Sequence, residues 1–596
     1  MAAVTSTCML ALLLPVVFHC HAAPPVHLAA AMAAGVKARR GDDKALRALD
    51  AWLKLYRSGG MDLRAKDIAK DSIAVKFGIA PKSGLRKPTW LGDLEAILDA
   101  VVQLDDANAA QGLLEVAAVG LDLTGKYTLE MAPYAVRAAG EKAIAKLTSG
   151  PAKEVLVSAA RGETEVKQRM AAAQSAALMC LGRSRDVSCR PVLEQALGAG
   201  DEMVRIAAAE ALGELGDEAA ALPLVALLDR ETVDAVLMTA AHSLRRLYAK
   251  YLPKAGDASA QPASPAGAPK ELPAGVPQAA RSATQALGRT TWRADMELIR
   301  LLDEFRSKEA VPALITQLER FSAHPEELKS GKLSGLLLCK AHALLVGMTG
   351  AEFPADQHEK WRAFWDAEKD KITVSDKGKP APGALPIAGS SLCGIPVQGT
   401  RVAFLLDVSQ SMDWPMDVEN PDVVKRMKRL DFAKRELKGA IDAMSPSAQF
   451  SLITFNGEDK AELWKLAPVP ATKPNRESFK KWIDGVRALG SGANLWAGLE
   501  EALKVKSVVY VNHSSNFDEL FVLSDGVPTC GAVQDPIEIL HLVQECNRFA
   551  CVRINTIFFR TVAPPDVMKR EARMSISPQE FMHRMAEQNG GTFKEL

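Results

Sequence analysis

The feature that most restricts how this chain can fold is an internal repeat within residues 165–248. Three alanine-rich segments of one pattern, each with Leu near its end, follow one another at offsets of 34 and 32 residues: 170–182, 204–216 and 236–247. Two apolar segments that begin with Pro fall between them: 191–197 and 223–228. A period of this length with two helical segments per unit predicts a helical solenoid, in which each unit buries its apolar face against its neighbours.

The pattern Ala-Leu-Gly-x-Leu-Gly-Asp at residues 211–217 resembles the short HEAT repeats of bacterial proteins. This resemblance implies an interaction scaffold. We expect HEAT-like repeats over residues 151–252, with a helical region before them at 24–150 and a helical, HEAT-like continuation after them at 286–370. An irregular helical domain is the alternative that the pattern leaves open.

Two stretches interrupt the helical pattern. Residues 253–285 are rich in Pro and Ala, with six prolines and nine alanines among the 28 residues of 253–280. Residues 371–398 are rich in Pro and Gly. Because Pro removes a backbone donor and favours extended chain, we predict a linker or loop at the first stretch and a linker at the second.

The pattern changes over residues 399–596, where apolar runs alternate with amphipathic segments. Strands are expected at residues 402–406, 450–455, 520–523 and 554–559, with a final edge strand at 591–594. Helices are expected at residues 425–444, 477–486, 495–505, 537–548 and 578–588. The alternation predicts an α/β fold with a doubly wound, Rossmann-like sheet, which binds ligands at the carboxyl ends of its strands.

Polar residues follow the expected strands at those carboxyl ends. Asp407, Ser409 and Ser411 follow the first strand, and Asp525 follows the third within a Ser-Asp-Gly-x-Pro-Thr sequence. A Gly-Ser-Gly-Ala-Asn sequence at residues 490–494 opens a helix between them. A hard cation such as Mg²⁺ prefers about six oxygen ligands, which hydroxyls and carboxylates supply. The alternative is that these residues only cap turns between strands and helices, where Asp and Ser are favoured.

The arrangement resembles the von Willebrand factor A domain and its metal-ion-dependent adhesion site, over nearly all of residues 399–596. The resemblance implies that a divalent cation, Mg²⁺ or in its place Mn²⁺ or Ca²⁺, is held by Asp407, Ser409, Ser411 and Asp525. It also implies an open metal position that takes an acidic side chain from a partner protein.

This chain departs from the family in its second loop. The family usually has Thr where Ala493 stands, so one hydroxyl ligand is missing. Ser491 or a water molecule is the expected replacement, and Asn494 is a further candidate ligand. The departure weakens the predicted metal site.

The N-terminus has the features of an exported protein. An apolar stretch at residues 8–18 is followed by Cys-His-Ala-Ala at 20–23, which predicts a signal peptide over residues 1–23. The stretch is shorter than the roughly 20 residues that span a bilayer, and no later stretch predicts a membrane span. We expect export to the periplasm, the cell envelope or the extracellular space. An Ala-rich disordered leader and lipidation at Cys20 are the alternatives.

Charge and cysteine content limit the remaining classes. Lys and Arg number 73 against 72 Asp and Glu, so no global field attracts nucleic acid, and we expect no nucleic-acid partner. Nine cysteines leave seven beyond the predicted leader, and an odd number spread this widely is no disulfide framework. Two pairings stay open, Cys180 with Cys189 and Cys546 with Cys551.

These patterns predict a non-enzymatic, exported protein-binding or scaffold protein with a metal-assisted adhesion-type site. The sequence contains no nucleophile elbow, phosphate-binding loop or paired Cys-x-x-Cys motif. The first alternative is a degenerate A domain that binds protein without metal. A lyase-like enzyme built on HEAT repeats is the second alternative.

Overall fold

The computed structural model describes residues 98–99, 102, 105–119, 139–163, 170–251, 273, 275–374, 389–416, 427–458, 461–490, 492–504, 515–531, 533–560 and 574–596. They fall into two compact units. The first contains the described residues up to Leu227 and His242–Tyr251, and the second contains Leu228–Ala241 and the described residues from 273 onward. The predicted signal peptide, and with it Cys20, lies outside the described residues.

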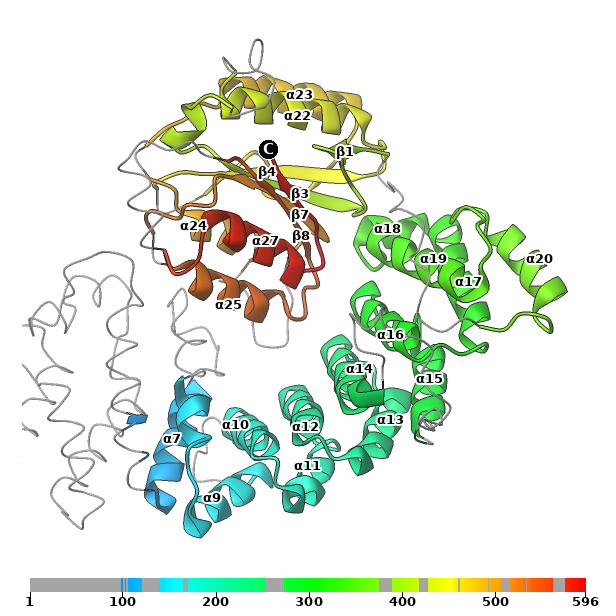
Figure 1. The fold of residues 1–596 in the computed structure, drawn as a ribbon, viewed down its shortest axis with the longest axis vertical. Coiled ribbons are helices and arrows are strands. Elements are labelled where there is room, and N and C mark those ends of the chain that lie inside the picture. Colours follow the sequence, from blue (N-terminus) through cyan, green and yellow to red (C-terminus); the bar gives the residue numbers. More distant parts are fainter. Residues whose placement is uncertain are drawn as a thin grey trace, which may run out of the picture. The chain divides into compact units, whose positions relative to one another are not determined.

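The repeat region is built from successive helices, which Figure 1 labels in chain order. They are α7 (Ala107–Val119), α9 (Gly150–Ala160), α10 (Met170–Arg183), α11 (Arg190–Ala196), α12 (Glu202–Leu215), α13 (Ala221–Arg230) and α14 (Asp234–Tyr248). The three predicted repeat segments lie in α10, α12 and α14, and the two segments between them lie in α11 and α13. The predicted helical repeat is therefore confirmed.

Small residues allow the repeat helices to pack closely. A Cβ atom added at Gly182 of α10 would lie 2.4 Å from the carbonyl oxygen of Ala211 in α12. Asp201 caps the N-terminus of helix α12, and its side chain accepts hydrogen bonds from the N–H groups of Met203 and Val204. Gly216, with a φ of 74°, caps the C-terminus. The glycine adopts this left-handed conformation without strain.

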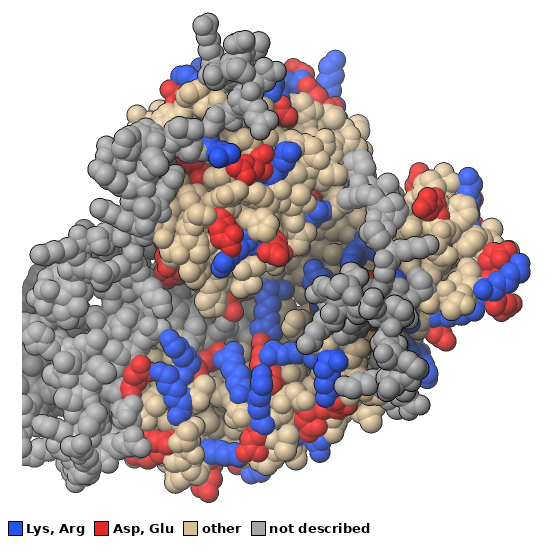
Figure 2. Space-filling model, viewed as in Figure 1, with Lys and Arg blue, Asp and Glu red and all other residues tan. Residues whose placement is uncertain are grey.

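Ion pairs join residues one repeat apart on the surface of the first unit. Glu214 pairs with Arg246, and Glu218 pairs with Lys250. Figure 2 shows basic and acidic side chains together over the repeat helices. Exposed pairs of this kind contribute little stability, so apolar burial between helices carries most of it.

Further helices precede the sheet within the second unit. They are α15 (Gly275–Ala286), α16 (Trp292–Glu304), α17 (Ala310–Ala323), α18 (Pro325–Ser330), α19 (Gly335–Thr349) and α20 (His358–Glu368). Trp292 and Trp361 are fully buried among them. Helices α16 to α20 lie within residues 286–370, for which the sequence predicts a helical continuation. Helix α15 lies instead in the stretch predicted as a linker or loop at 253–285, so that prediction is wrong from Gly275 onward. Pro277 falls in the first turn of this helix, where a proline is tolerated.

A seven-stranded sheet forms the C-terminal part of the second unit. Its strands run in the order β5 (Glu462–Leu463), β4 (Gln449–Phe455), β3 (Arg401–Asp407), β7 (Glu519–Ser524), β8 (Arg553–Phe558) and β9 (Phe593–Glu595), and β6 (Val469–Pro470) also pairs with β4. Strands β4, β3, β7, β8 and β9 are parallel, whereas β5 and β6 run antiparallel to β4. The predicted doubly wound α/β sheet is confirmed, with two short edge strands and a small hairpin, β1 (Ser391–Leu392) with β2 (Ile395–Pro396), that the sequence pattern does not indicate.

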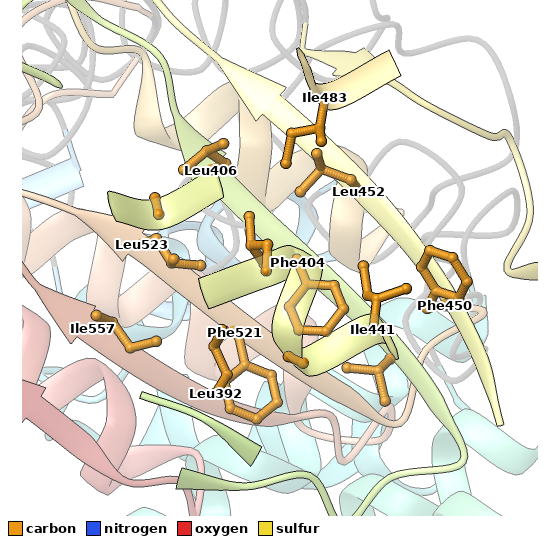
Figure 3. Close-up of a cluster of buried hydrophobic side chains, with 14 of the residues drawn as sticks. Leu392, Phe404, Leu406, Ile441, Phe450, Leu452, Ile483, Phe521, Leu523 and Ile557 are labelled. Carbon is orange, nitrogen blue, oxygen red and sulfur yellow. The ribbon is translucent and has the colours of Figure 1, made fainter. Parts of the chain in front are cut away.

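Helices cover both faces of the sheet. Figure 1 shows α22 (Arg429–Ala443) and α23 (Lys473–Gly485) on one face, and α24 (Leu495–Leu503), α25 (Pro536–Asn547) and α27 (Pro578–Gln588) on the other. On the first face, Figure 3 shows Phe404, Phe450 and Phe521 of the strands in one buried cluster with Ile441 and Ile483 of the helices. Since both faces are buried, the carboxyl edge of the strands is left for a binding site.

Two hydrogen bonds join helices of the second unit to its sheet region. The hydroxyl of Ser334, the N-cap residue of α19, donates to Asp518 Oδ2 over 2.7 Å. Arg293 Nε donates to the carbonyl of Ala550 over 2.9 Å. All four residues are buried.

The predicted linker at residues 371–398 is wrong at its C-terminal end, because residues 389–398 contain the β1–β2 hairpin, and Leu392, Ile395 and Val397 belong to the buried core of the sheet. Residues 375–388 lie outside the described ranges, and for them the linker stays a prediction.

No helix within the described ranges is long and apolar enough to cross a membrane.

Candidate functional site

Strands β3 and β7 end side by side and place two polar residues together. Asp407 is the last residue of β3 and Ser524 the last of β7, and these strands pair in parallel. The Asp407 carboxylate is fully buried; its Oδ2 accepts a hydrogen bond from Ser524 Oγ over 2.7 Å, and its Oδ1 accepts one from the N–H of Ser409 over 2.8 Å. The first predicted site residue is therefore fixed in place by its neighbours.

The two serines of the first loop bring their hydroxyls together. Ser409 Oγ and Ser411 Oγ are 3.1 Å apart. Adjacent ligands of an octahedral Mg²⁺ ion, each at about 2.1 Å from the metal, lie about 3 Å from each other. The spacing of these two hydroxyls therefore fits adjacent positions of such an ion.

Asp525 adds a second carboxylate to the same edge of the sheet. It follows Ser524 directly and is 5% exposed, and its Oδ1 accepts a hydrogen bond from the N–H of Val527 over 3.3 Å. Burial raises the pKa of Asp407 above its usual range, and the nearby charge of Asp525 raises it further. A cation beside the pair would favour the charged form of Asp407.

The second loop is held by Thr529 from the Asp525 loop. The N–H of Ala493 donates to Thr529 Oγ1 over 2.8 Å, and the N–H of Thr529 donates to the Ala493 carbonyl over 3.0 Å. Ala493 is buried, and Ser491 lies outside the described residues. The hydroxyl that contacts this loop therefore comes from Thr529.

Asn494 uses its side chain to hold the same loop. Its Oδ1 accepts a hydrogen bond from the N–H of Ala497 over 3.1 Å and so caps helix α24. Its Nδ2 donates to the carbonyl of Glu458 over 3.0 Å. These contacts support a positioning role, and a ligand role for Asn494 stays a prediction.

The structure places a buried arginine, Arg429, at the site, and the sequence did not predict it as a site residue. Arg429 begins helix α22, and its side chain is 2% exposed. Its Nη1 lies 3.5 Å from Asp525 Oδ2. Nothing in the sequence marks an arginine at a helix start as buried, since arginines there are usually solvated. Thr529 and Ser524 could have been predicted as site residues from the sequence, because both belong to the Ser-Asp-Gly-x-Pro-Thr segment.

The donor set offered by these loops consists of oxygen atoms. Two carboxylates and two hydroxyls gather there, and the described part of the chain holds no group of three or more His, Cys, Asp and Glu residues placed to bind a metal. Oxygen donors with few negative charges suit Mg²⁺, which keeps several waters. The residues therefore fit the predicted ion, and its binding stays a prediction.

The described cysteines are all free thiols: Cys180, Cys189, Cys339, Cys393, Cys530, Cys546 and Cys551. Neither pairing that the sequence left open is present in this structure. Burial raises the pKa of the Cys180 thiol beyond the usual range, which favours its protonated form.

Comparison with known proteins identifies two segments. Residues 402–588 match the model of the von Willebrand factor type A domain, and residues 167–245 match that of HEAT repeats. Human inter-alpha-trypsin inhibitor heavy chain H4 is 27% identical over 161 residues, which are 26% of this chain and 15% of that protein. The chain thus spans a small fraction of the length of this relative.

Two solved structures show weaker likeness. An aerotolerance-related membrane protein from Bacteroides fragilis is 14% identical with a TM-score of 0.22, covering 33% of this chain and 90% of that one. The PilB minor pilin from Streptococcus sanguinis is 14% identical with a TM-score of 0.23, covering 38% of this chain and 62% of that one. TM-scores of this size support no inference about function.

Proposed function

We propose that this chain, with its von Willebrand factor type A domain at residues 402–588 and its HEAT repeats at residues 167–245, is a non-enzymatic protein-binding or scaffold protein. Its A domain would contact a partner through a bound divalent cation. Mg²⁺ is the ion that the oxygen donors suit best, with Mn²⁺ or Ca²⁺ as substitutes.

The observation that supports this proposal most is the buried Asp407 carboxylate beside Asp525 and two serine hydroxyls. Two buried carboxylates repel each other, so a cation stabilises them. Asp407, Ser409, Ser411 and Asp525 would hold the ion directly or through water. A bound ion would supply an electrophilic position for the carboxylate of an acidic side chain on a partner protein.

The repeat helices would serve as a second contact surface. HEAT-type solenoids expose an extended row of helices, and successive units add area without a new fold. Basic and acidic side chains share the surface that Figure 2 shows, which suits a protein partner of mixed charge.

Export completes the proposal and rests on the leader sequence alone. The apolar stretch at residues 8–18 and the small residues after it support cleavage near Ala23 or Pro24. Intact-mass measurement of the protein from its native host tests this. A retained Met1 would refute it.

A metal-free A domain that binds protein is the second candidate function. The absence of a hydroxyl at Ala493 and the buried guanidinium of Arg429 favour it. In this case the same surface would meet its partner through hydrogen bonds and apolar contact alone.

Calorimetric titration of the metal-depleted full-length protein with Mg²⁺ and Mn²⁺ distinguishes the metal-dependent function from the metal-free one. We expect one cation per chain for the wild type and none for Asp407→Asn, which removes the buried charge and keeps the shape. Asp413→Asn is the matched control, because Asp413 lies in the same loop but is exposed and paired with Lys428. Absence of binding in the wild type, or equal binding by Asp407→Asn, would favour the metal-free function.

A further inference from the structure

The guanidinium of Arg429 occupies a position beside the acidic pair of the proposed site. We propose that Arg429 is the internal counter-cation of Asp525, the neighbour of the buried Asp407 carboxylate, and that it keeps the site formed without metal and competes with a divalent cation for Asp525. The competition with a divalent cation rests on the proposed function. The role of Arg429 in the metal-free site does not depend on it.

Arg429 is connected to several segments around the site. Its Nη1 donates to the carbonyl of Ser411 over 3.3 Å, and its Nη2 donates to the carbonyl of Arg560 over 2.9 Å. Its backbone N–H donates to the carbonyl of Trp414 over 2.9 Å, and its guanidinium lies 5.5 Å from the centre of the Trp414 ring. These contacts fix the cation at the carboxyl edge of the sheet.

The two buried carboxylates of the site are stabilised by the positive charge of the Arg429 guanidinium. Asp407 and Asp525 are buried to 0% and 5% exposure, and two carboxylates in this setting repel each other. The Arg429 guanidinium, 3.5 Å from Asp525 Oδ2, offsets one of the two negative charges. Truncation of one partner of such a buried pair leaves the other charge uncompensated, which is strongly unfavourable.

The contact between Arg429 and Asp525 also means that a divalent cation must compete with the guanidinium for this carboxylate. Asp525 Oδ1 is engaged by the N–H of Val527, and Oδ2 faces Arg429. A divalent cation that uses Asp525 would share this carboxylate with a positive charge already in place. Arg429 would therefore lower the affinity for metal and preserve the loop geometry while metal is absent.

Hydrogen exchange of the metal-free full-length protein, read by mass spectrometry, tests the first part. We expect Arg429→Met to speed exchange in residues 401–416 and 515–531 at least threefold, because an unbalanced buried charge promotes local opening. In an Asp525→Asn background the same substitution should have a clearly smaller effect. Lys428→Met is the control, since it removes an exposed positive charge one residue away. Equal effects of Arg429→Met in both backgrounds would show a purely packing role and overturn the proposal.

Mg²⁺ titration of the same variants tests the second part. Removal of a unit positive charge near the ion should tighten binding about threefold to tenfold in Arg429→Met, whereas Arg429→Lys keeps the charge and should stay near the wild type. Unchanged or weaker binding in Arg429→Met would overturn the competition. If no variant binds Mg²⁺, the metal-dependent function fails, and the exchange experiment alone decides whether Arg429 balances the charge of Asp525.

Discussion

The hydroxyl of Ser524 donates a hydrogen bond to Asp407 Oδ2 over 2.7 Å, which joins the last residue of β7 to the last residue of β3. The two strands are neighbours in the parallel sheet, so the loops that follow them start from one fixed point. The contact also satisfies an oxygen that is shielded from water. The strand ends therefore fix the Asp407 carboxylate, and the contacts of Thr529 and Arg429 hold the loops around it.

Restoring the missing hydroxyl should strengthen the proposed metal site. Ala493→Thr places a hydroxyl in a buried loop whose backbone is fixed by hydrogen bonds to the side chain and to the backbone N–H of Thr529. We expect calorimetry to show Mg²⁺ affinity several-fold higher than that of the wild type. Ala493→Val has the same shape without the oxygen and should give no gain. If Thr and Val behave alike, the hydroxyl is not a ligand.

Asp295 of α16 should make the second unit more stable in acid. Burial raises the pKa of this carboxyl to about 7, while the N–H of Gly288 and the guanidinium of Arg320 oppose the rise. The folded state therefore holds the proton that the unfolded chain releases near pH 4. The stabilisation is complete below about pH 4 and is lost as the pH rises to 7, a change of at most roughly 4 kcal/mol.

Urea denaturation of the full-length protein at several pH values measures this effect. Asp295→Asn cannot ionise and should remove the fall in stability between pH 4 and 7. Asp356→Asn, which changes an exposed carboxyl of the same unit, should leave the fall in place. A pH profile that Asp295→Asn does not alter would contradict the prediction.

The sequence was sufficient to predict the sheet and the positions of the first site residues. Continuous apolar runs mark strands buried on both faces, and the parallel order then brings their carboxyl ends together. Asp407 and Asp525 lie within the segments that follow two such runs, so local pattern alone indicated their approach. The short edge strands β5 and β6 have two residues each, too few for a periodic signal.

The contacts that complete the site could not be predicted because they join distant segments. Arg429 reaches Asp525 and the carbonyl of Arg560 across the folded sheet, and its local sequence resembles any solvated helix start. Thr529 reaches Ala493, 36 residues away, through a loop contact that no spacing rule describes. Burial of a charged or polar group becomes visible only when its partners have been placed.

Close packing in the repeat gives a stability prediction for the first unit. Gly182→Ala adds a Cβ that would meet the backbone of Ala211 at 2.4 Å, so α10 and α12 must separate. The cost of such overpacking is about 1–3 kcal/mol, and thermal denaturation followed by circular dichroism should show it. Gly198→Ala is the control, because the nearest atom to its added Cβ is at 3.5 Å. Equal stability of the two variants would show that the helices adjust freely.

Limited proteolysis should cut the chain in the linker, and the two fragments should stay associated. Pro and Gly are concentrated at residues 376–386, ahead of the β1–β2 hairpin, so cleavage there should yield a fragment of about 210 residues that includes the hairpin. Because Ser334 donates to Asp518 and Arg293 to the Ala550 carbonyl, the cleaved fragments should elute together on size exclusion. The double substitution Ser334→Ala with Arg293→Met removes both hydrogen bonds and should release the fragment, although Asp518 Oδ2 keeps its hydrogen bonds from Thr400. Separate elution of the wild-type fragments would show that these contacts do not hold the A domain to its helices.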